Sequence, residues 1–512
     1  MPVPPPDPKA VADVAAGYRL GLSDADAESF QPFVSGVLGS WDEVERLYAN
    51  IAPATPHRAW KRPAAADNPY NAWYVTTEIT GSPDGPLAGR TVAIKDNTAV
   101  AGVPMMNGSK TVEGFVPSED ATVVRRVLDA GATITGKAVC EDLCFSGGSH
   151  TARTGPVRNP WEETRSTGGS SSGNAALLAA GLVDLAIGGD QGGSVRMPAA
   201  FSGVVGHKPT HGLVPYTGAF PIEQTIDHLG PMTRTVTDAA TLLAVLAGAD
   251  GLDPRQPTAL PGLDLAEFLA AVRQPAAGLR VGVVREGFGR DNSEPGVDKT
   301  VHAAVRTLRD AGLVTDEVSI PWHLLGVHVW NVIGIEGTLT QMVDGNGYGA
   351  NWPGRYDPEL IEHYGRQWRA APHEFSPTVQ MLMLAGGYTR ELFHHKHYAM
   401  ARNLVPSLCQ GYDEALASYD VLVMPTVPMT ATTIPPADAP REEVLGRALE
   451  MVGNTCPLDV SGHPACSVPA GLSEGLPVGL MIIGKHFDDA TVLRVAHTFE
   501  QAVGGFPAPP QP

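Results

Sequence analysis

From Gly89 onward, short apolar segments alternate with segments of helical character, and this alternation restricts the chain to few folds. Helices are expected at residues 120–131, 174–182 and 488–503, the last beginning at Asp488 and Asp489. Buried strands are expected at residues 91–96, 132–138, 183–189, 279–286, 420–426, 465–471 and 478–484. This pattern predicts an α/β domain whose sheet is covered by helices on both faces.

Two parts of the chain depart from the alternation. Residues 6–21, 23–39 and 40–51 each have apolar positions at helical spacing and a Gly or Pro stop, so they predict three helices before a Pro-rich connector. Between about Ile320 and Ala448, four of the eight tryptophans surround a Gly-rich turn, which indicates a small helical insertion (Trp322, Trp330, Trp352, Trp368). We therefore expect an N-terminal helical region (1–80), an α/β domain (81–320 and 449–512) and a small insertion or cap domain (321–448).

Composition excludes several classes of protein. Hydrophobic residues make up 43% of the 512 positions and charged residues 18%, so a large core can be buried and disorder is excluded. The formal net charge of −19 argues against a nucleic-acid partner or an anionic membrane surface. The first residues lack a secretory signal, and no apolar run reaches the ~18 residues that could cross a bilayer. We expect a cytoplasmic protein.

Three partial motifs are weak. The segment 131–138, GATITGKA, nearly matches a phosphate loop, but Ala138 replaces the hydroxyl residue and the segment itself is expected to be a strand. His394 and His397 stand three residues apart on an expected helix without a third ligand. The five cysteines, with only Cys140 and Cys144 closely spaced, form neither a disulfide framework nor a zinc site. We therefore expect no metal.

The segment 165–210 places two Gly-Ser turns on either side of one helix–strand unit. Paired glycines allow positive φ and bring backbone N–H groups close to a ligand. GSSSG at residues 169–173 also matches the G-x-S-x-G elbow of α/β-hydrolases, with Ser171 as nucleophile. That elbow must directly follow a strand. The preceding NPWEETRSTG is polar and turn-rich, which disfavours this alternative.

This segment, GGSSSGNAALLAAGLVDLAIGGDQGGSVRMPAAFSGVVGHKPT, resembles the amidase signature sequence, and AIKDN at 93–97 resembles the lysine motif of that family. Lys95 precedes Ser170 by 75 residues and Ser194 follows it by 24, spacings that fit the family's Ser–cisSer–Lys triad. The resemblance extends from about Gly89 to the end of the chain, through GKAVCEDLCFSG, RNPW and GLPVGLMIIGKHFDDATVLRVA. Within the family, the chain is most similar to actinobacterial enantioselective amidases often found beside nitrile hydratases.

Two positions depart from the family pattern. Ser172 and Asn174 stand where many members have Gly and Ser. Both lie beside the triad serines and not at them, so we expect catalysis to be intact. The resemblance also implies the amidase-signature fold, which has a central mixed twisted sheet.

A serine nucleophile needs a base within hydrogen-bond reach. No histidine of the signature stands beside a Gly-flanked serine, since His207 belongs to the following turn. Lys95 is the remaining candidate, and it could act as a base only if burial lowered its pKa. The resemblance implies that Ser194 is the nucleophile and that Ser170, held by a cis peptide bond after Gly169, relays the proton to Lys95.

The resemblance also implies supporting roles. The consecutive N–H groups of the turn suit an oxyanion hole (Gln191, Gly192, Gly193, Ser194). Asp190, Arg196 and Ser171 are expected to support this turn from outside. An acyl-side pocket is expected from Phe145, Ile226, Trp330 and Met451.

The function implied is hydrolysis of small-molecule carboxamides through an acyl-enzyme, in a cytoplasmic homodimer without a cofactor. An aryl-acylamidase, esterase or carbamate hydrolase on the same triad is the alternative, because these substrates share the acyl-transfer step. The glutamine-hydrolysing subunit of a tRNA-dependent amidotransferase fits less well, since it would need partner subunits. A catalytically inactive binding module is disfavoured by the intact Lys95, Ser170 and Ser194.

Overall fold

A computed structural model describes residues 3–257 and 260–510 of the chain. Contacts within the backbone divide it into two units, residues 1–56 and 57–512. None of the helices in the described ranges combines the length and apolar character that a bilayer span requires.

The first unit contains two contacting helices, α1 (Pro8–Gly17) and α2 (Asp24–Tyr48). The sequence predicted three helices, and this prediction is wrong because residues 23–39 and 40–51 form one continuous helix. A glycine inside a helix costs only about 1 kcal/mol relative to alanine. Gly36 and Gly39 therefore stay helical where no left-handed residue or proline follows to end the helix.

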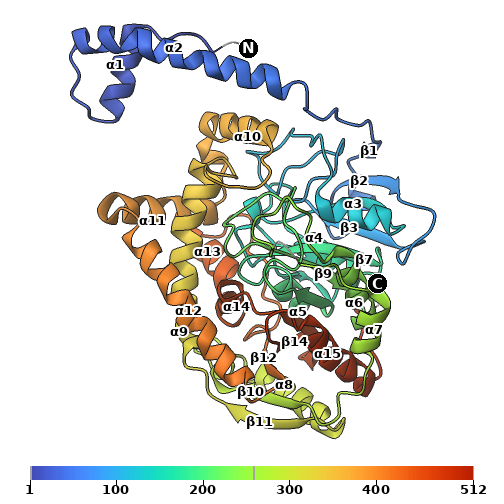
Figure 1. Cartoon of the computed structure of the whole chain (residues 1–512). Coiled ribbons are helices and arrows are strands. Elements are labelled where there is room, and N and C mark those ends of the chain that lie inside the picture. The colour runs from blue at the N-terminus through green and yellow to red at the C-terminus, as the bar shows by residue number, and fades with distance from the viewer. Residues whose placement is uncertain (1–2, 258–259, 511–512) are drawn as a thin grey trace. The chain divides into compact units, whose positions relative to one another are not determined.

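The second unit is organised by one large sheet (Figure 1). Within the described residues this sheet has twelve strands in the order β1-β2-β4-β3-β7-β9-β8-β13-β14-β12-β10-β11. Their bounds are β1 (Trp60–Lys61), β2 (Trp73–Thr80), β3 (Thr91–Lys95), β4 (Thr133–Ala138), β7 (Leu185–Asp190), β8 (Val205–Lys208), β9 (His228–Thr233), β10 (Arg280–Val284), β11 (Val314–Val318), β12 (Val421–Pro425), β13 (Ala465–Ser473) and β14 (Leu476–Ile483). A separate hairpin consists of β5 (Arg158–Asn159) and β6 (Glu162–Ser166).

The sheet is mixed, as predicted. Strand β3 runs parallel to β4 and β7, and β10 runs parallel to β11 and β12, whereas the other pairs are antiparallel. The predicted α/β fold with a central mixed sheet flanked by helices is confirmed. The segment that nearly matches a phosphate loop is strand β4, in which the buried Lys137 pairs with Asp96 at 2.9 Å.

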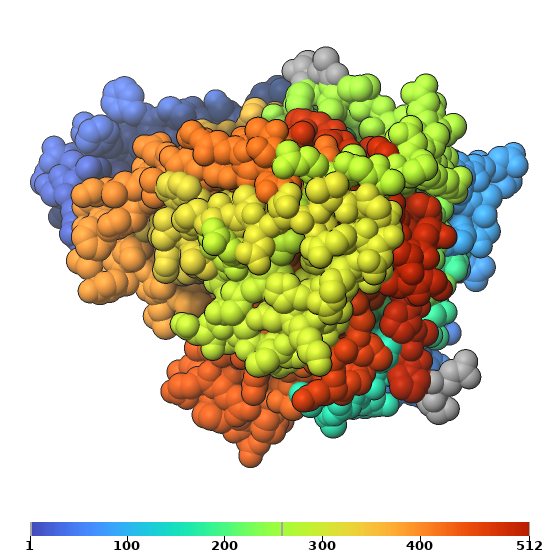
Figure 2. Space-filling model, turned by 90° about the horizontal axis from the view of Figure 1, so that it is seen from below, coloured from blue at the N-terminus to red at the C-terminus, as the bar shows by residue number. Residues whose placement is uncertain are grey.

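Helices pack against this sheet in two groups. Helices α4 (Ser172–Ala179) and α5 (Arg196–Ser202) contact each other, and between them contact β3, β7, β8 and β14. A second group is connected through the terminal helix: α6 (Val236–Leu246), α7 (Leu265–Val272), α8 (Pro295–Asp310) and α15 (Asp489–Val503), with α3 (Thr122–Asp129) beside α6. In Figure 2 the yellow-green segment around β10 and α8 lies directly beside the red terminal helix α15.

The middle of the chain is helical around the pocket described below. Helix α9 (Trp322–Val332) continues into the π-helical turns η4 (Ile333–Gly337) and η5 (Leu339–Asp344). The remaining helices are α10 (Pro358–Ala370), α11 (Pro377–Phe393), α12 (Lys396–Leu416), α13 (Arg441–Leu449) and α14 (Cys456–Ser461). Short 3-10 turns are η1 (Ala65–Asp67), η2 (Asp142–Cys144), η3 (Arg285–Gly287), η6 (Pro372–Glu374) and η7 (Val452–Asn454).

One helix expected in this region is interrupted. His394 and His395 adopt left-handed backbone conformations, with φ of 52° and 64°, so α11 ends before them and α12 begins after them. His394 and His397 therefore do not share one helix face, contrary to expectation. The division at residues 80, 320 and 448 stays a prediction, but β2 and β12, which it places outside the α/β domain, are both hydrogen-bonded into the central sheet.

Candidate active site

Lys95 is the last residue of β3, in the middle of the sheet. Three buried apolar residues precede it, and its own side chain is 0% exposed. Its Nζ donates to Ser170 Oγ at 2.8 Å and to the carbonyl of Gly189 at 3.0 Å. Gly189 belongs to β7, the parallel neighbour of β3, so the register of these two strands fixes the position of the ammonium group.

Ser170 lies in the loop that leads into α4 and is fully buried. The Gly169–Ser170 peptide bond is cis, as the resemblance implied. A Cβ on Gly169 would lie 2.2 Å from the carbonyl oxygen of Gly148, so only glycine fits at this position. The Ser170 carbonyl accepts from the N–H of Glu141 at 3.3 Å. Ser171 joins the loop to the next turn, because its N–H donates to the carbonyl of Ser194 at 3.3 Å.

The two departures from the family pattern are accommodated in the buried interior. Ser172 Oγ donates to Glu141 Oε1 at 3.0 Å, and Asn174 Nδ2 donates to the Ile187 carbonyl at 2.8 Å. The second carboxylate oxygen of Glu141 accepts from the N–H and hydroxyl of Thr151 at 2.8 and 2.7 Å. Burial raises the pKa of Glu141 to about 7, although these hydrogen bonds oppose it.

The turn between β7 and α5 carries Ser194 and is held by a buried ion pair. The Asp190 carboxylate accepts from the N–H of Gly193 at 2.5 Å and pairs with Arg196 Nε at 2.9 Å. Arg196 also contacts Asp459 of α14 at 2.7 Å, and all three side chains are fully buried. Burial alone would raise the pKa of Asp190, but the charge and hydrogen bonds of Arg196 outweigh it and hold that pKa well below its usual value.

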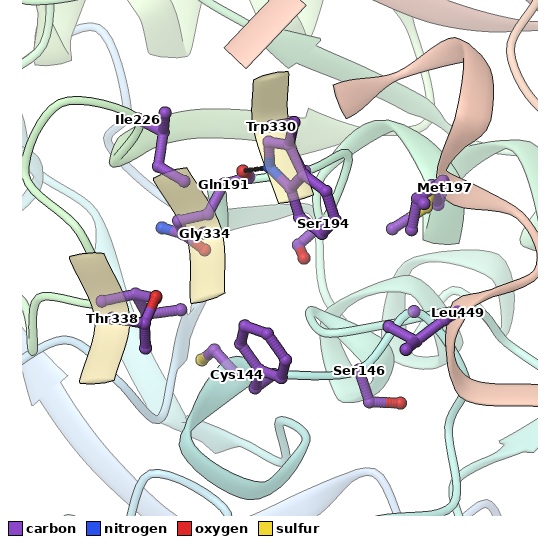
Figure 3. A pocket seen from close by; sticks show the side chains of 15 residues that line it. Cys144, Ser146, Gln191, Ser194, Met197, Ile226, Trp330, Gly334, Thr338 and Leu449 are labelled. Carbon is purple, nitrogen blue, oxygen red and sulfur yellow. Dashed lines mark hydrogen bonds between the residues drawn. The ribbon is translucent and has the colours of Figure 1, made fainter. Parts of the chain in front are cut away.

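Two more side chains hold the carbonyls of this turn from outside. Trp330 Nε1 donates to the Gln191 carbonyl at 2.7 Å (Figure 3), and Thr455 Oγ1 donates to the Gly192 carbonyl at 2.6 Å. Gly193 has φ of +129°, and a Cβ there would lie 2.2 Å from Thr455 Oγ1. Both conditions require glycine.

The four N–H groups expected to face an oxyanion are not equivalent. That of Gly193 is engaged by Asp190. Over residues 3–257 and 260–510, the N–H groups of Gln191, Gly192 and Ser194 have no hydrogen-bond partner. Three of the four N–H groups of this turn are therefore without a protein partner in the described ranges.

A cavity of about 420 Å³ opens beside this turn (Figure 3). Its wall is mostly apolar, and Ser194, 5% exposed, lies on it. The lining residues are Cys144, Phe145, Ser146, Gly147, Gln191, Gly192, Ser194, Met197, Ile222, Ile226, Trp330, Gly334, Thr338, Leu449 and Val452. A mostly apolar lining with a few polar groups suits a small organic molecule.

Three of the four residues proposed for the acyl side, Phe145, Ile226 and Trp330, line this cavity. Met451 does not. Its side chain is fully buried in a cluster with Met197, and its sulfur would lie 2.5 Å from a Cβ on Gly147. It therefore packs behind the wall. Leu449 and Val452, close to it in sequence, reach the cavity instead, because the turn after α13 directs Met451 inward.

The sequence singles out Cys144 only as half of a possible zinc motif, yet this residue lines the cavity beside Lys95 and Ser170. Its thiol and that of Cys140 both donate to Asn107 Oδ1, at 3.2 and 3.4 Å. Burial would raise the pKa of Cys144, but the hydrogen bond from Cys140 and the charge of Lys95 outweigh it and lower the pKa to about 7. Nothing in the spacing of the two cysteines could have indicated this contact.

The histidines lie in other contacts. His207 Nε2 pairs with Asp489 at 2.9 Å, His150 Nε2 contacts the Val444 carbonyl at 3.1 Å, and His228 Nδ1 contacts the Ile226 carbonyl at 2.8 Å. Within the described ranges, no histidine ring is hydrogen-bonded to Ser170 or Ser194. The basic group in contact with the serine loop is Lys95.

Comparisons with known proteins agree with this geometry. The amidase family model matches residues 43–493. An enantioselective amidase of Rhodococcus rhodochrous is 56% identical over 510 residues, which covers 99% of this chain and 98% of the relative. A glutamyl-tRNA(Gln) amidotransferase subunit of Exiguobacterium sibiricum is 37% identical, over 84% of this chain and 88% of the relative. The solved structure of a peptide amidase from Stenotrophomonas maltophilia is similar with a TM-score of 0.69 and 31% identity, over 83% of this chain and 85% of that one.

Proposed function

The chain belongs to the amidase signature family and is an amide hydrolase, and on that premise we propose that it cleaves small carboxamides with Ser194 as nucleophile, Ser170 as proton relay and Lys95 as base. The observation that carries this assignment is the 2.8 Å hydrogen bond between Lys95 Nζ and Ser170 Oγ. Both groups are fully buried, which keeps bulk water away from the proton path.

The proposed reaction has two halves. With Lys95 neutral, Ser170 passes its proton to Lys95 and takes the proton of Ser194, while Ser194 Oγ attacks the amide carbon. The carbonyl oxygen becomes an oxyanion that the N–H groups of Gln191, Gly192 and Ser194 stabilise. The C–N bond then breaks, and the nitrogen leaves as ammonia or an amine with the proton returned from Lys95. Water enters by the same relay, attacks the ester of Ser194 and releases the carboxylic acid.

The remaining charges of the site support this turn. The Asp190 carboxylate accepts from the N–H of Gly193 and so stabilises the turn. The N–H groups proposed to bind the oxyanion are not used for this contact. Arg196 neutralises Asp190 and links it to Asp459 of α14. We propose that this buried network, and Ser171 between the two loops, position the oxyanion donors without touching the substrate.

The substrate class proposed is carboxamides with an apolar or aromatic acyl group. Phe145, Ile226 and Trp330 contribute apolar surface to the cavity beside Ser194, and a large apolar acyl group would cover more of that surface than the methyl group of acetamide does. An aryl-acylamidase, ester or carbamate activity on the same residues is the second candidate, since the acyl-transfer step is shared. An amidotransferase role is disfavoured because the similarity to the amidotransferase subunit covers 84% of this chain, whereas the similarity to the enantioselective amidase covers 99%.

The base is tested by substitution. Lys95→Ala should lower kcat/KM by several orders of magnitude, because removing a catalytic base costs ~10²–10⁴-fold and more when it acts as one unit with its nucleophile. Ser194→Ala should abolish turnover and leave the circular dichroism spectrum unchanged. The matched controls His150→Ala, His207→Ala and His228→Ala should keep substantial activity. A folded histidine variant as inactive as Lys95→Ala would overturn the lysine mechanism.

The substrate class is tested with a panel of acetamide, longer aliphatic amides, aromatic amides, anilides, esters and carbamates, compared by kcat/KM. Both enantiomers of an α-substituted carboxamide belong in the panel, since a relative is named for enantioselectivity. The highest value is expected for an aromatic or large apolar carboxamide. If acetamide ranked first, the proposed pocket would be wrong.

We also propose a cytoplasmic homodimer. Within its own unit α2 leaves large apolar side chains uncovered, among them Phe33 and Trp41, and such a row of apolar groups is typical of a protein interface. All five cysteines are unpaired, which fits a reducing compartment. Light scattering of the full chain should give twice the mass of the monomer, and Phe33→Glu should shift it toward the monomer. A monomeric wild type would contradict the proposal.

A further inference from the structure

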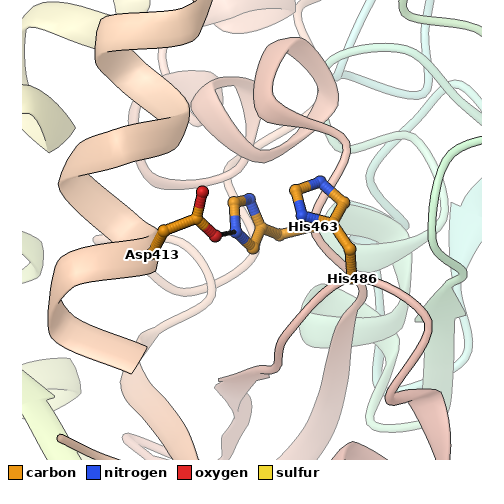
Figure 4. A group of neighbouring side chains, drawn as sticks. All are labelled: Asp413, His463 and His486. Carbon is orange, nitrogen blue, oxygen red and sulfur yellow. Dashed lines mark hydrogen bonds and ion pairs between the residues drawn. The ribbon is translucent and has the colours of Figure 1, made fainter. Parts of the chain in front are cut away.

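Three side chains with metal-binding groups meet outside the pocket described above (Figure 4). Asp413 comes from α12, His463 from the segment between α14 and β13, and His486 from the segment between β14 and α15. One ligand atom of each lies within 4.8 Å of the other two. The closest pair is His463 Nε2 and Asp413 Oδ1, at 3.1 Å.

Both imidazole rings are oriented by a single residue, Ser461. The hydroxyl of Ser461 contacts His463 Nδ1 at 3.0 Å, and its carbonyl accepts from His486 Nε2 at 2.9 Å. A neutral imidazole that donates through one nitrogen has its lone pair on the other. Histidines that bind metal ions almost always have such an outer hydrogen bond, which fixes the tautomer and the ring orientation. His486 therefore has its lone pair on Nδ1. His463 Nε2 donates to the Asp413 carboxylate without a metal ion, and it can bind one when the Nδ1–H of His463 donates to the Ser461 hydroxyl.

One separation, 3.1 Å between His463 Nε2 and Asp413 Oδ1, matches that of a zinc site, and the other two are at most 4.8 Å. Zinc binds imidazole nitrogen at about 2.0–2.1 Å and carboxylate oxygen at about 2.0–2.2 Å in tetrahedral geometry, which places ligand atoms roughly 3.3 Å apart. His463 is 0% exposed and provides a fixed anchor, whereas the Asp413 side chain is 57% exposed and His486 is also exposed. Rotation of the exposed Asp413 side chain can bring its carboxylate toward the two imidazoles.

We propose that Asp413, His463 and His486 bind one divalent transition-metal ion of the zinc class, with solvent as the fourth ligand. A metal ion at this position joins α12 to the segments that follow α14 and β14. The site lies at the end of α14 opposite to Thr455, and its occupancy does not enter the reaction proposed for Ser194.

The test titrates Zn²⁺ into the full chain, without a histidine tag and after chelator treatment, in competition with a chromogenic zinc indicator. We expect one site per chain and a melting temperature that rises with the Zn²⁺ concentration, as for any ligand that binds only the native state. His486→Ala and Asp413→Asn, both at exposed positions, should weaken Zn²⁺ binding by at least the ~10–100-fold that loss of an outer partner costs. Ser461→Ala should weaken it by a smaller factor.

The matched control is His373→Ala, which removes a 78% exposed histidine next to a carboxylate but outside the cluster. It should keep the wild-type affinity and the wild-type thermal shift. The metal-free His486→Ala and Asp413→Asn variants should keep wild-type kcat/KM, because neither residue touches the catalytic turn. The proposal would be overturned if the wild type bound no Zn²⁺ or bound it no more tightly than His486→Ala does. The cluster would then be only a hydrogen bond between His463 and Asp413 with His486 beside it.

Discussion

Glu141 is a buried carboxyl whose ionisation the fold penalises. Its Oε1 accepts from Ser172 and its Oε2 from Thr151, yet burial raises its pKa from 4.5 to about 7. Glutamine has the same shape and no charge. Its carbonyl can accept from Thr151, and its amide can donate to Ser172 Oγ, which also contacts the Val139 carbonyl at 3.4 Å. Glu141→Gln should therefore mimic the protonated wild type at every pH.

The sign of the effect follows from proton linkage. Below pH 4.5 the carboxyl is protonated in both states and contributes no pH dependence. Between pH 4.5 and 7 the unfolded chain ionises first, so the native state binds more protons and stability falls as pH rises. At 1.36 kcal/mol per unit the full loss is about 3 kcal/mol, of which roughly 2.5 kcal/mol falls between pH 5 and pH 8. The glutamine variant avoids this loss.

The measurement is the melting temperature of wild type and variant at pH 5, 6, 7 and 8. An unfolding entropy of about 2.1 cal/mol/K per residue, over a unit of roughly 450 residues, converts 2.5 kcal/mol to about 2–3 °C. The difference, variant minus wild type, should grow by that amount from pH 5 to pH 8. The matched control is Glu113→Gln. Hydrogen bonds from Lys110 and Arg62 lower the pKa of Glu113, so the difference in melting temperature between this variant and the wild type should stay constant over this range. A constant or falling difference for Glu141→Gln would refute the reasoning.

Three further predictions concern the pocket. Trp330→Phe removes the donor to the Gln191 carbonyl and keeps an aromatic wall, so kcat should fall about tenfold with little change in KM, measured on an aromatic amide. Thr455→Val removes the donor to the Gly192 carbonyl and should also lower kcat about tenfold, whereas Thr455→Ser should restore it. Alkylation of Cys144 should inactivate the enzyme with a pH midpoint below the ~8.5 of a free thiol, and Cys144→Ala should resist the reagent; a midpoint at or above ~8.5 would contradict the lowered pKa.

Much of the fold could be predicted because its signals are local. Several strands of the sheet are short apolar runs bounded by Gly or a polar residue, as in residues 91–95 and 478–483, and such runs need no knowledge of their partners. Strands β8 and β9 lack such a run, and the sequence did not predict them. Errors arose where a local signal was ambiguous. Gly39 is typical of a helix end and is helical, whereas His394 has a helical sequence context and ends a helix, because its left-handed conformation is set by packing and not by residue type.

The residues of the candidate site also include some that the sequence could indicate and others that only the structure shows. Lys95, Ser170 and Ser194 could be named in advance because their segments resemble the amidase signature and its lysine motif, whereas the paired glycines alone fit Ser171 as well. Thr455 and Asp459 contact the same turn from about 260 residues away in sequence, and nothing about a threonine or an aspartate in a short helix announces such a contact. Met451 lies one residue away from the lining residue Val452, and this error reflects the direction of side chains in a turn.

The turn that carries Ser194 is held by residues that are synthesised at very different times. Asp190 and Arg196 are made together with Ser194, but Thr455 follows about 260 residues later. At ~5–20 residues per second, a ribosome needs roughly 15–50 s to synthesise that interval. During this time the nascent turn has its local ion pair and lacks the hydroxyl that fixes the Gly192 carbonyl. Activity should therefore appear only when the last quarter of the chain has been synthesised and folded, so that a stalled or truncated product carries a serine turn that cannot yet hydrolyse amides.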